Sequence, residues 1–541
     1  MSPADAAGDI GEAAASRRAN AGESGDEHLL ASLPSRISDI AFLGARRWPH
    51  AAALRDARGA WTYAELATAV EATRKNLADA GVRPGDRVLV ASENAAATVV
   101  LLLAIATLDA WAVIVNARLS PREVDAIRDH CRPRRSLYLA DVSPEAGAHA
   151  KRHGAFEVLS LGGMGKVVMG ELDTHCAPEA THADSARQTA ALVYTSGTTG
   201  DPKGVMLSHR NLLYIARVSS TLRALDCTDT VYGVLPVSHV YGLASVCLGT
   251  LKAGACLLLE PRFSPEAMLD AITRRGVTVL QGVPSMYARL GEHMRARGPS
   301  IVGTTLRLLY AGGSPLDPGL KAATEQLFGL TLHNGYGLTE AAPTISQTRL
   351  HAPRSDCSVG TVIPGCEIRI VDAAGRAVVE REPGALHVRG PNVMLGYYRN
   401  PSLTAATIDS EGWLDTGDLA RQDADGALFI VGRTKELIIR SGFNVYPIEV
   451  ESVLNAHPSV LQSAVVGREV ESNEEVIAFV ELVPGSSTSV ESLLEFCVDR
   501  LAPYKRPSEI VLTSLPLASN GKVQKRLLKT MARQRSPEGV A

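Results

Sequence analysis

The sequence predicts an α/β protein, with a large N-terminal domain of α/β sheets and helices, including a small β-rich subdomain, followed by a small α+β C-terminal domain. Strand and helix patterns alternate through the first part of the chain at the spacing typical of largely parallel sheets. Short alternating runs separated by Gly, Pro and Asp begin at Ser358, and the pattern changes again after Lys435. The 541 residues also exceed what a single core usually supports.

These changes of pattern predict four segments. Residues 1–28 are rich in Ala, Gly, Ser, Asp and Glu without an apolar signal-peptide core, which is typical of a disordered tail. We expect the large domain at 29–434, with its β-rich subdomain at about 358–434, the small domain at 435–533 and a second tail at 534–541.

The composition describes an ordinary globular protein. Hydrophobic residues make up 45%, charged residues 21%, and the net charge is −3, so no basic bias suggests a nucleic-acid partner. The 8 cysteines form no CxxC pair, which favours neither a zinc site nor a disulfide framework. A reduced cytoplasmic setting is therefore expected, and no oligomeric state follows from the sequence.

The apolar run at 95–115 is long enough to suggest a membrane span. It contains Asp109 and is followed by Asn116 and Arg118. A buried helix and strand explain the run equally well, and we favour that interpretation, without an integral membrane segment.

Helix caps and apolar runs predict the elements of the first part. The segments TYAE at 62–65 and SPRE at 120–123 are capping boxes, and the helices they open should end at Gly81 and before Pro133. The expected elements are helices at 62–81, 96–108 and 120–132 and strands at 87–91 and 137–140.

The later elements follow from the same signals. Ser264-Pro265 opens a capped helix that Gly276 ends, and Tyr446-Pro447 opens another. The expected strands lie at 189–194, 231–236, 277–280, 306–310, 367–371, 385–388, 427–431, 462–466, 476–483 and 509–513. The expected helices lie at 208–222, 264–276, 446–456 and 490–501.

A segment dense in hydrogen-bond donors follows the strand expected at 189–194. Residues 194–205 read YTSGTTGDPKGV, and such a loop binds an anion close to the main chain, most simply a polyphosphate, rather than acting only as a flexible turn. It is not a GxxxxGK[ST] loop, because Lys203 does not follow a glycine and a proline precedes it. The donors are Thr195, Ser196, Gly197, Thr198, Thr199, Gly200 and Lys203.

Three further segments have the residue types that bind a nucleotide, although each alone is also typical of an ordinary turn. YAGGS at 310–314 would let a flat base approach the backbone at its glycines. NGYGLTEA at 334–341 carries an aromatic ring that can stack on a purine and a carboxylate that suits Mg²⁺. WLDTGD at 413–418 presents two acids, either of which can accept ribose hydroxyls.

The segment at 194–205 resembles the phosphate-binding loop of adenylate-forming enzymes, the superfamily of acyl-CoA synthetases, peptide-synthetase adenylation domains and luciferases. The other motifs follow in that superfamily's order, and the resemblance covers about residues 36–530. It implies an AMP-forming acid–thiol ligase. With Mg²⁺ and ATP the enzyme would convert a carboxylic acid to its acyl-adenylate, release pyrophosphate and pass the acyl group to a thiol.

The resemblance also implies a role for individual residues. Tyr336 would stack on adenine, Thr339 would lie beside the phosphates, and Glu340 would bind magnesium together with Thr195. Asp418 would hold the ribose with help from Arg433. The other residues implied at the nucleotide and CoA sites are Gly312, Gly313, Ser314, Asn334, Gly335, Gly337, Phe429, Ser441 and Gly442.

The resemblance assigns one lysine to the movement of the small domain and another to the chemical step. Lys435 stands at the hinge position, so the small domain would be mobile and would swing to complete two reactions in turn. Lys522, in SNGKVQK at 519–525, would bridge the substrate carboxylate and the α-phosphate. Residues 504–506 (YKR) are a candidate CoA contact, with a plain surface patch slightly favoured.

The acid is expected to be apolar. A lone histidine such as His239 is more often a packing residue, but the resemblance gives it a role in positioning the acyl carboxylate. Between 231 and 259 there is no acidic residue to hold an amine, which argues against an amino acid. Candidates for the acyl pocket are Tyr241, Met286, Ala341, Ala342 and Pro343.

The predicted function is therefore an ATP-dependent carboxylic acid–CoA ligase acting on a medium- or long-chain fatty, alicyclic or aryl acid. Plant-type aryl-acid ligases often have a lysine where Ile439 stands, which shifts the expectation slightly towards fatty or alicyclic acids. Two alternatives stay open: an acyl-AMP ligase that loads a carrier protein, and a non-catalytic nucleotide-binding relative.

Overall fold

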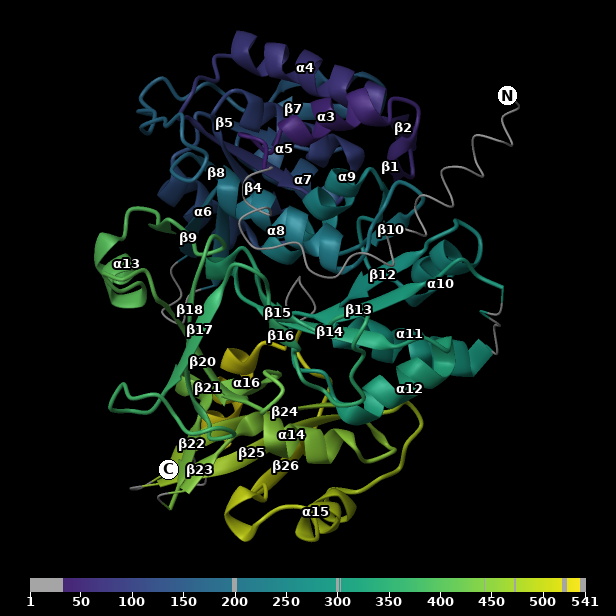
Figure 1. Cartoon of the computed structure of the whole chain (residues 1–541), viewed down its shortest axis with the longest axis vertical. Coiled ribbons are helices and arrows are strands. Elements are labelled where there is room, and N and C mark those ends of the chain that lie inside the picture. The colour runs from purple at the N-terminus through teal and green to yellow at the C-terminus, as the bar shows by residue number, and fades with distance from the viewer. Residues whose placement is uncertain are drawn as a thin grey trace.

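The structure is a computed structural model, and it describes residues 33–196, 202–297, 301, 303–441, 443–470, 473–517 and 523–535. The expected tail at 1–28 and residues 536–541 lie outside these ranges. In Figure 1 two large sheets and their helices fill the upper part of the molecule, and the C-terminal elements lie below them.

One large sheet is nine-stranded, in the order β16-β15-β14-β13-β12-β10-β11-β1-β2. Its neighbours from β14 to β1 are parallel, and antiparallel pairs close both edges. The strands are β1 (Ala52–Asp56), β2 (Gly59–Thr62), β10 (Thr230–Gly233), β11 (Cys256–Leu259), β12 (Val279–Gly282), β13 (Leu308–Gly312), β14 (Leu332–Gly337), β15 (Thr344–Gln347) and β16 (Thr361–Val362).

The second large sheet is eight-stranded, in the order β19-β9-β8-β4-β3-β5-β7-β6. Its centre, β8-β4-β3-β5, is parallel and its flanks are antiparallel. The strands are β3 (Arg87–Ser92), β4 (Trp111–Asn116), β5 (Arg135–Tyr138), β6 (Glu157–Ser160), β7 (Lys166–Met169), β8 (Thr189–Ser196), β9 (Pro202–Ser208) and β19 (Gly396–Tyr397).

Helices pack around these sheets and join their strands. They are α3 (Asp39–Arg47), α4 (Tyr63–Asp79), α5 (Ala96–Thr107), α6 (Pro121–Cys131), α7 (Pro144–Arg152), α8 (His209–Leu222), α9 (Gly249–Ala253), α10 (Pro265–Thr273), α11 (Pro284–Arg297), α12 (Pro318–Phe328) and α13 (Pro401–Thr407). Short helical turns are η1 (Gly162–Met164), η2 (Tyr241–Leu248) and η3 (Thr339–Ala341). The capping boxes at Thr62 and Ser120 form as the sequence predicts.

The apolar run at 95–115 is a buried helix and strand, as we favoured. Helix α5 contacts β3 and β4 of one sheet and β1 of the other, so it lies between the sheets. Its residues 96–106 are all buried, and with 12 residues it is too short to cross a bilayer. Within the described ranges, no helix combines the length and the apolar character that a membrane span needs.

The C-terminal part begins with an antiparallel sheet in the order β17-β18-β20-β21 and ends in a smaller unit with its own apolar cores. The strands are β17 (Glu367–Val371), β18 (Gly384–Arg389), β20 (Leu414–Gln422), β21 (Leu428–Arg433), β22 (Ile438–Arg440), β23 (Phe443–Val445), β24 (Val460–Val470), β25 (Asn473–Leu482) and β26 (Glu509–Leu512). The helices are η4 (Thr434–Glu436), α14 (Pro447–Asn455), α15 (Val490–Val498), η5 (Pro503–Lys505) and α16 (Lys525–Gln534).

The α/β fold class is confirmed, but several predicted boundaries were wrong. Strand β5 begins two residues before its predicted start, and β12 and β13 begin two residues after theirs, while β10 ends at Gly233 and α15 at Val498. Apolar residues such as Val277 and Leu306 are buried ahead of the ladder, so hydrophobicity alone marks the strand too early. The sequence analysis also missed β9, which pairs antiparallel with β8.

Candidate active site

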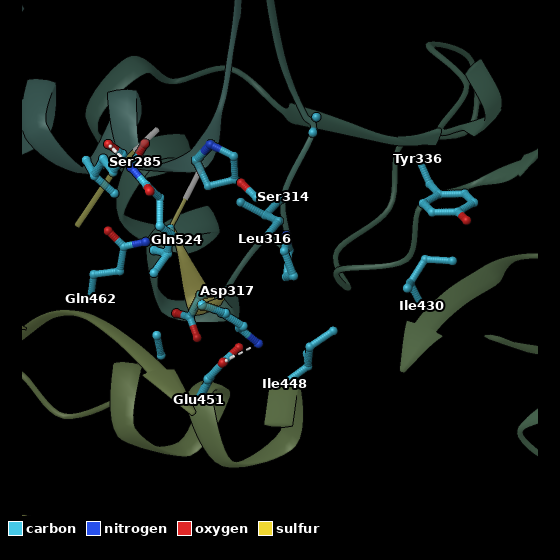
Figure 2. A pocket seen from close by; sticks show the side chains of 18 of the residues that line it. Ser285, Ser314, Leu316, Asp317, Tyr336, Ile430, Ile448, Glu451, Gln462 and Gln524 are labelled. Atoms are coloured by element: carbon cyan, nitrogen blue, oxygen red, sulfur yellow. Dashed lines mark hydrogen bonds and ion pairs between the residues drawn. The ribbon is translucent and has the colours of Figure 1, made fainter. Parts of the chain in front are cut away.

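A cleft of about 3190 Å³ separates the large sheets from the C-terminal elements. Figure 2 shows Tyr336 and Ile430 at one end of it, and Glu451 and Gln462 reaching it from the C-terminal side. Ser314 at the end of the β13 segment also lines this cleft. The cleft therefore collects motifs that are hundreds of residues apart in the chain.

Tyr336, Asp418 and Arg433 form one corner of the cleft. The Tyr336 hydroxyl donates to Asp418 Oδ2 at 2.5 Å, and Arg433 Nε lies 2.9 Å from Asp418 Oδ1. Strands β20 and β21 pair Asp418 directly with Arg433. Burial, and then the Asp418 charge, raise the pKa of Tyr336, while the same charge raises the pKa of Arg433. The Asp418 carboxylate is therefore held in place by partners on both of its oxygens.

The glycines of two motifs lie side by side at the carboxyl ends of parallel strands. Strands β13 and β14 are neighbours, and Gly312 pairs with Gly335. A Cβ atom at Gly335 would lie 1.9 Å from the Tyr310 hydroxyl, and one at Gly337 would lie 1.9 Å from the Pro343 carbonyl oxygen. Gly313 has a φ of 85°, which favours glycine. Gly335 and Gly337 are therefore needed for Tyr310 and Pro343 to pack on this backbone, and the approach of a flat base to Gly312 and Gly313 stays a prediction.

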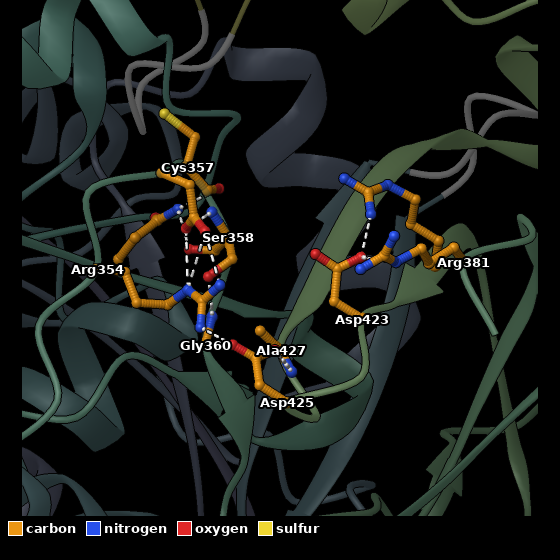
Figure 3. Close-up of polar contacts among 11 residues, drawn as sticks. Arg354, Cys357, Ser358, Gly360, Arg381, Asp423, Asp425 and Ala427 are labelled. Atoms are coloured by element: carbon orange, nitrogen blue, oxygen red, sulfur yellow. Dashed lines mark hydrogen bonds and ion pairs between the residues drawn. The ribbon is translucent and has the colours of Figure 1, made fainter.

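A loop held by salt bridges contacts Asn334, the residue before Gly335 in β14. Asn334 Nδ2 donates to the carbonyl oxygens of Cys357 and Ser358, at 3.3 and 3.2 Å. Arg354, which binds Asp356 and Asp425, holds that loop against the β20–β21 turn, as Figure 3 shows. The strand that carries Tyr336 is thus fixed from both sides.

The segment expected to bind phosphate is described only in part, as two paired antiparallel strands, β8 and β9. Thr195 of β8 pairs with Lys203 of β9, and both line the cleft. The Lys203 ammonium lies 5.6 Å from the centre of the Tyr397 ring. Gly197, Thr198, Thr199 and Gly200 lie outside the described residues, as does the side chain of Ser196.

Tyr397 is a site residue that the sequence analysis missed. Its hydroxyl donates to Glu340 Oε1 at 2.8 Å, and burial, then the Glu340 charge, raise the pKa of Tyr397. The backbone carbonyl of Glu340 also accepts a hydrogen bond from the Met394 N–H at 2.9 Å. Both the side chain and the backbone of Glu340 are therefore held in place. No local motif marks Tyr397, because its partner is 57 residues away.

The donor set around Glu340 fits a magnesium ion that is held mainly by phosphates. Glu340, Thr339 and Thr195 all line the cleft and supply oxygen atoms, which Mg²⁺ prefers. In the described part of the chain, no group of three or more His, Cys, Asp and Glu side chains is placed to hold a metal by itself. One carboxylate beside a polyphosphate is the usual protein share of such a site.

The acyl end of the cleft is built around His239 and Tyr241. His239 Nδ1 accepts the Tyr241 N–H at 3.3 Å, and Tyr241 begins η2, an eight-residue π-helix, a form often found at functional sites. Met286 and Pro343 also line the cleft. The predicted pocket residues Ala341 and Ala342 are fully buried and do not line it, so their assignment was wrong.

The hinge position lies on the cleft rim. Lys435 is exposed in η4 and lines the cleft, as does Phe429 of β21. Ser441 is placed away from it, with a φ of 52° and its N–H bonded to Asn473 Oδ1 at 2.7 Å. Gly442 and Lys522 lie outside the described residues.

Lys525 ties the C-terminal helix α16 to η4 and α14. Its ammonium lies 3.0 Å from Glu436 Oε2 and 2.9 Å from Glu451 Oε1, and Gln524 beside it lines the cleft. The two carboxylates raise the pKa of Lys525 against the opposing effect of burial. The start of α16 is thereby held against η4 and α14.

The surface patch at 504–506 is already partnered. Lys505 Nζ lies 2.6 Å from Glu449 Oε1, and the Tyr504 ring stacks on Phe443 at 4.6 Å. These contacts agree with the surface interpretation but do not test a CoA contact.

Comparison with known proteins agrees with this arrangement. The family described as AMP-binding enzyme matches residues 43–398, and the AMP-binding enzyme C-terminal domain matches residues 449–522. A feruloyl-CoA synthase from Amycolatopsis sp is 36% identical over 485 residues, which is 89% of this chain and 96% of that protein.

Two solved structures extend the likeness. An anthranilate CoA ligase in complex with anthranoyl-AMP is 25% identical with a TM-score of 0.83, covering 93% of this chain and 99% of that one. An o-succinylbenzoate CoA synthetase from Bacillus subtilis, in complex with ATP and magnesium ion, is 30% identical with a TM-score of 0.76, covering 91% and 99%.

Proposed function

This chain belongs to the AMP-binding enzyme family and ligates a carboxylic acid to CoA through an acyl-adenylate, and we propose that the acid is an aryl acid. Feruloyl-CoA synthase and anthranilate CoA ligase, named for aryl acids, are similar over nine-tenths of the chain. ATP, Mg²⁺ and CoA are the other reactants and the cofactor of this reaction.

The observation that carries the proposal is the aromatic wall of the acyl end. The rings of Tyr241 and Tyr310 lie edge to face, 6.5 Å apart, and both line the cleft with His239. An aromatic acid fits against such rings with favourable ring–ring geometry. The Tyr241 hydroxyl is buried without a hydrogen-bond partner, and a long alkyl chain, which carries no acceptor, would leave it unbonded.

Ile439 does not lie in the acyl pocket. Ile439 lies in β22 of the C-terminal part, is 53% exposed, and is not among the described residues that line the cleft. The Ile439 side chain therefore does not contact an acid in the pocket in this arrangement of the chain. It gives no reason to prefer a fatty or alicyclic acid.

The roles of the individual residues remain proposals. Asp418, with Arg433 as its ion-pair partner, would accept the ribose hydroxyls, and Tyr336 would cover the adenine. Lys203 and Thr195 would bind phosphate oxygens, and His239 would position the acyl carboxylate. The resemblance gives Lys522 the charge between carboxylate and α-phosphate. Mg²⁺, when bound beside Glu340, would neutralise charge on the phosphate oxygens.

A substrate panel tests the proposal. The purified protein would meet Mg-ATP with cinnamate, 4-hydroxycinnamate, benzoate or octanoate, with and without CoA, and products would be identified by mass spectrometry. We expect aryl-CoA only when CoA is present, with a kcat/KM for the best aryl acid at least about tenfold above octanoate. Octanoyl-CoA as the main product would overturn the aryl assignment, and acyl-AMP accumulating regardless of CoA would indicate carrier loading.

A further inference from the structure

A buried arginine forms the floor of the acyl end. Arg223 directly follows helix α8 and is 1% exposed, yet it lines the cleft together with Tyr241 and Tyr310. Its guanidinium donates to the side-chain oxygens of Gln281 at 2.6 Å and Gln347 at 3.4 Å, and its carbon lies 4.1 Å from the centre of the Tyr310 ring.

All of these partners are neutral. Across the described residues, no carboxylate lies within ion-pair distance of Arg223, whereas the neighbouring Arg307 is paired with Asp229 at 2.5 Å. A charge taken out of water needs a counter-charge or a full set of hydrogen bonds to offset its desolvation. In the described part of the chain, Arg223 has no counter-charge and only part of its hydrogen bonds.

The polar groups around it are also incompletely bonded. Four buried atoms in this cluster lack a hydrogen-bond partner: Arg223 Nε, the Tyr241 hydroxyl, Gln281 Nε2 and Gln347 Nε2. All four carry hydrogens that can be donated. Buried polar atoms nearly always have a hydrogen-bond partner in native proteins. A group of donors without partners in one place therefore indicates a missing acceptor.

The cluster faces the place where the acid must lie. Tyr241 begins the π-helix two residues after His239, and its ring edge lies 3.3 Å from where a Cβ on Gly312 would be. An acid that lies beside Gly312 and Tyr241 is therefore in the part of the cleft that Arg223 also lines. An acid that fills this space carries its remote end to the idle donors.

We propose that Arg223 and the Tyr241 hydroxyl together bind a second, hydrogen-bond-accepting oxygen group on the acid, at the end remote from the carboxylate that is adenylated. This inference rests on the proposed aryl-acid function and deepens it. A phenolic oxygen or a second carboxylate both supply this chemistry, and a guanidinium can bind either through its paired N–H groups.

Three acids that differ only in the remote group test this. We would measure kcat/KM for cinnamate, 4-hydroxycinnamate and 4-carboxycinnamate with the wild-type protein. We expect one or both of the substituted acids to exceed cinnamate by at least about tenfold, because a site built to bond an oxygen discriminates against the analogue that lacks it. The better of the two identifies which oxygen group is bound.

Two variants assign the preference to its residues. Arg223→Met should bring the ratio of substituted to unsubstituted acid close to one, and Tyr241→Phe, which removes a single oxygen, should lower it several-fold. Arg349→Met is the matched control, because Arg349 is a partly buried arginine near Tyr310 that donates to backbone carbonyls, and its ratio should stay at the wild-type value. A ratio measured on one preparation does not depend on the folded fraction, and Tyr241→Phe keeps the test valid if Arg223→Met does not fold.

The outcomes separate this inference from the proposed function. Equal kcat/KM for all three acids in the wild-type protein would overturn the Arg223 assignment and leave the aryl-acid ligase intact, with ordered water as the acceptor. A preference that survives in both variants would overturn it as well. No aryl-CoA product beside good turnover of octanoate would overturn both.

Discussion

The two ends of the cleft differ in how their charges are satisfied. At the nucleotide end, Asp418 already has Arg433 and the Tyr336 hydroxyl as partners. At the acyl end, Arg223 is more deeply buried than Arg433, yet it has only neutral partners, and donor atoms around it are idle. The first end is preorganised by the protein itself, whereas the second is completed by its ligand.

This difference teaches where specificity resides. A preorganised carboxylate can select a ribose without rearrangement, and its contacts need not change from one acid to another. An incomplete donor cluster penalises every acid that brings no acceptor, so it discriminates among substrates. Four variants or conditions test this difference between the two ends of the cleft.

The largest effect is expected at Lys522, which the resemblance places in the chemical step. Lys522→Ala should lower adenylate formation by roughly 10²–10³-fold, because charge developing between carboxylate and α-phosphate loses its stabilisation. Thioester formation from a supplied acyl-adenylate should stay near the wild-type rate. Single-turnover assays of the two half-reactions measure this, and an equal loss in both would show that the lysine assignment or the hinge interpretation is wrong.

A smaller effect is expected at the nucleotide end. Asp418→Asn should raise the KM for ATP in pyrophosphate exchange by roughly tenfold to a hundredfold, since Arg433 loses its counter-charge and the ribose loses a charged acceptor. The KM for the acid should not change. Asp372→Asn, in an exposed turn paired with Arg376, is the control. A shift in the KM for the acid instead would contradict the separation of the two ends.

Helix α8 is followed directly by Arg223 and begins with a neutral histidine, His209. Burial, and then the Arg36 charge, lower the pKa of His209 to about 3, from 6.5 in the unfolded chain, and His209 Nδ1 accepts the Ile37 N–H. The unfolded chain therefore binds the proton first as pH falls below 6.5, and the free energy of unfolding should drop by about 2 kcal/mol at pH 5.

Urea unfolding at pH 7 and pH 5 measures this contribution. His209→Asn retains an acceptor without the titration, so it should remove this part of the pH dependence. An unchanged slope in the variant would show that His209 does not stay neutral in the fold.

The smallest effect is expected at the metal position. Glu340→Gln keeps an acceptor for the Tyr397 hydroxyl but removes the charge, and it should raise the Mg²⁺ concentration for half-maximal activity about tenfold. Mg-ATP binding followed by thermal shift gives a second readout. Unchanged activity at limiting magnesium would refute the proposed role, and Tyr397→Phe shows how much of the effect comes from positioning.

Local chemistry explains why much of the fold could be predicted. The capping boxes at Thr62 and Ser120 need only a hydroxyl and a glutamate three residues later, so the helix starts were correct. Strand ends were less accurate, because a ladder begins where its neighbour begins, and the sequence does not contain that information. The small domain and its bounds stay a prediction, although the chain from Ile438 onward has apolar cores of its own.

The sequence by itself determined the order of the short motifs that contain Tyr336, Glu340 and Asp418, and their resemblance to those of adenylate-forming enzymes gives each residue its proposed ligand. Only the tertiary structure decided which side chains meet. Tyr397 reaches Glu340 across 57 residues, and Arg223 reaches Gln347 across 124. Those contacts depend on how separate elements pack, because Tyr397 and Gln347 lie on antiparallel strands of different sheets. An arginine after an amphipathic helix does not reveal, without that packing, whether it faces water or a ligand.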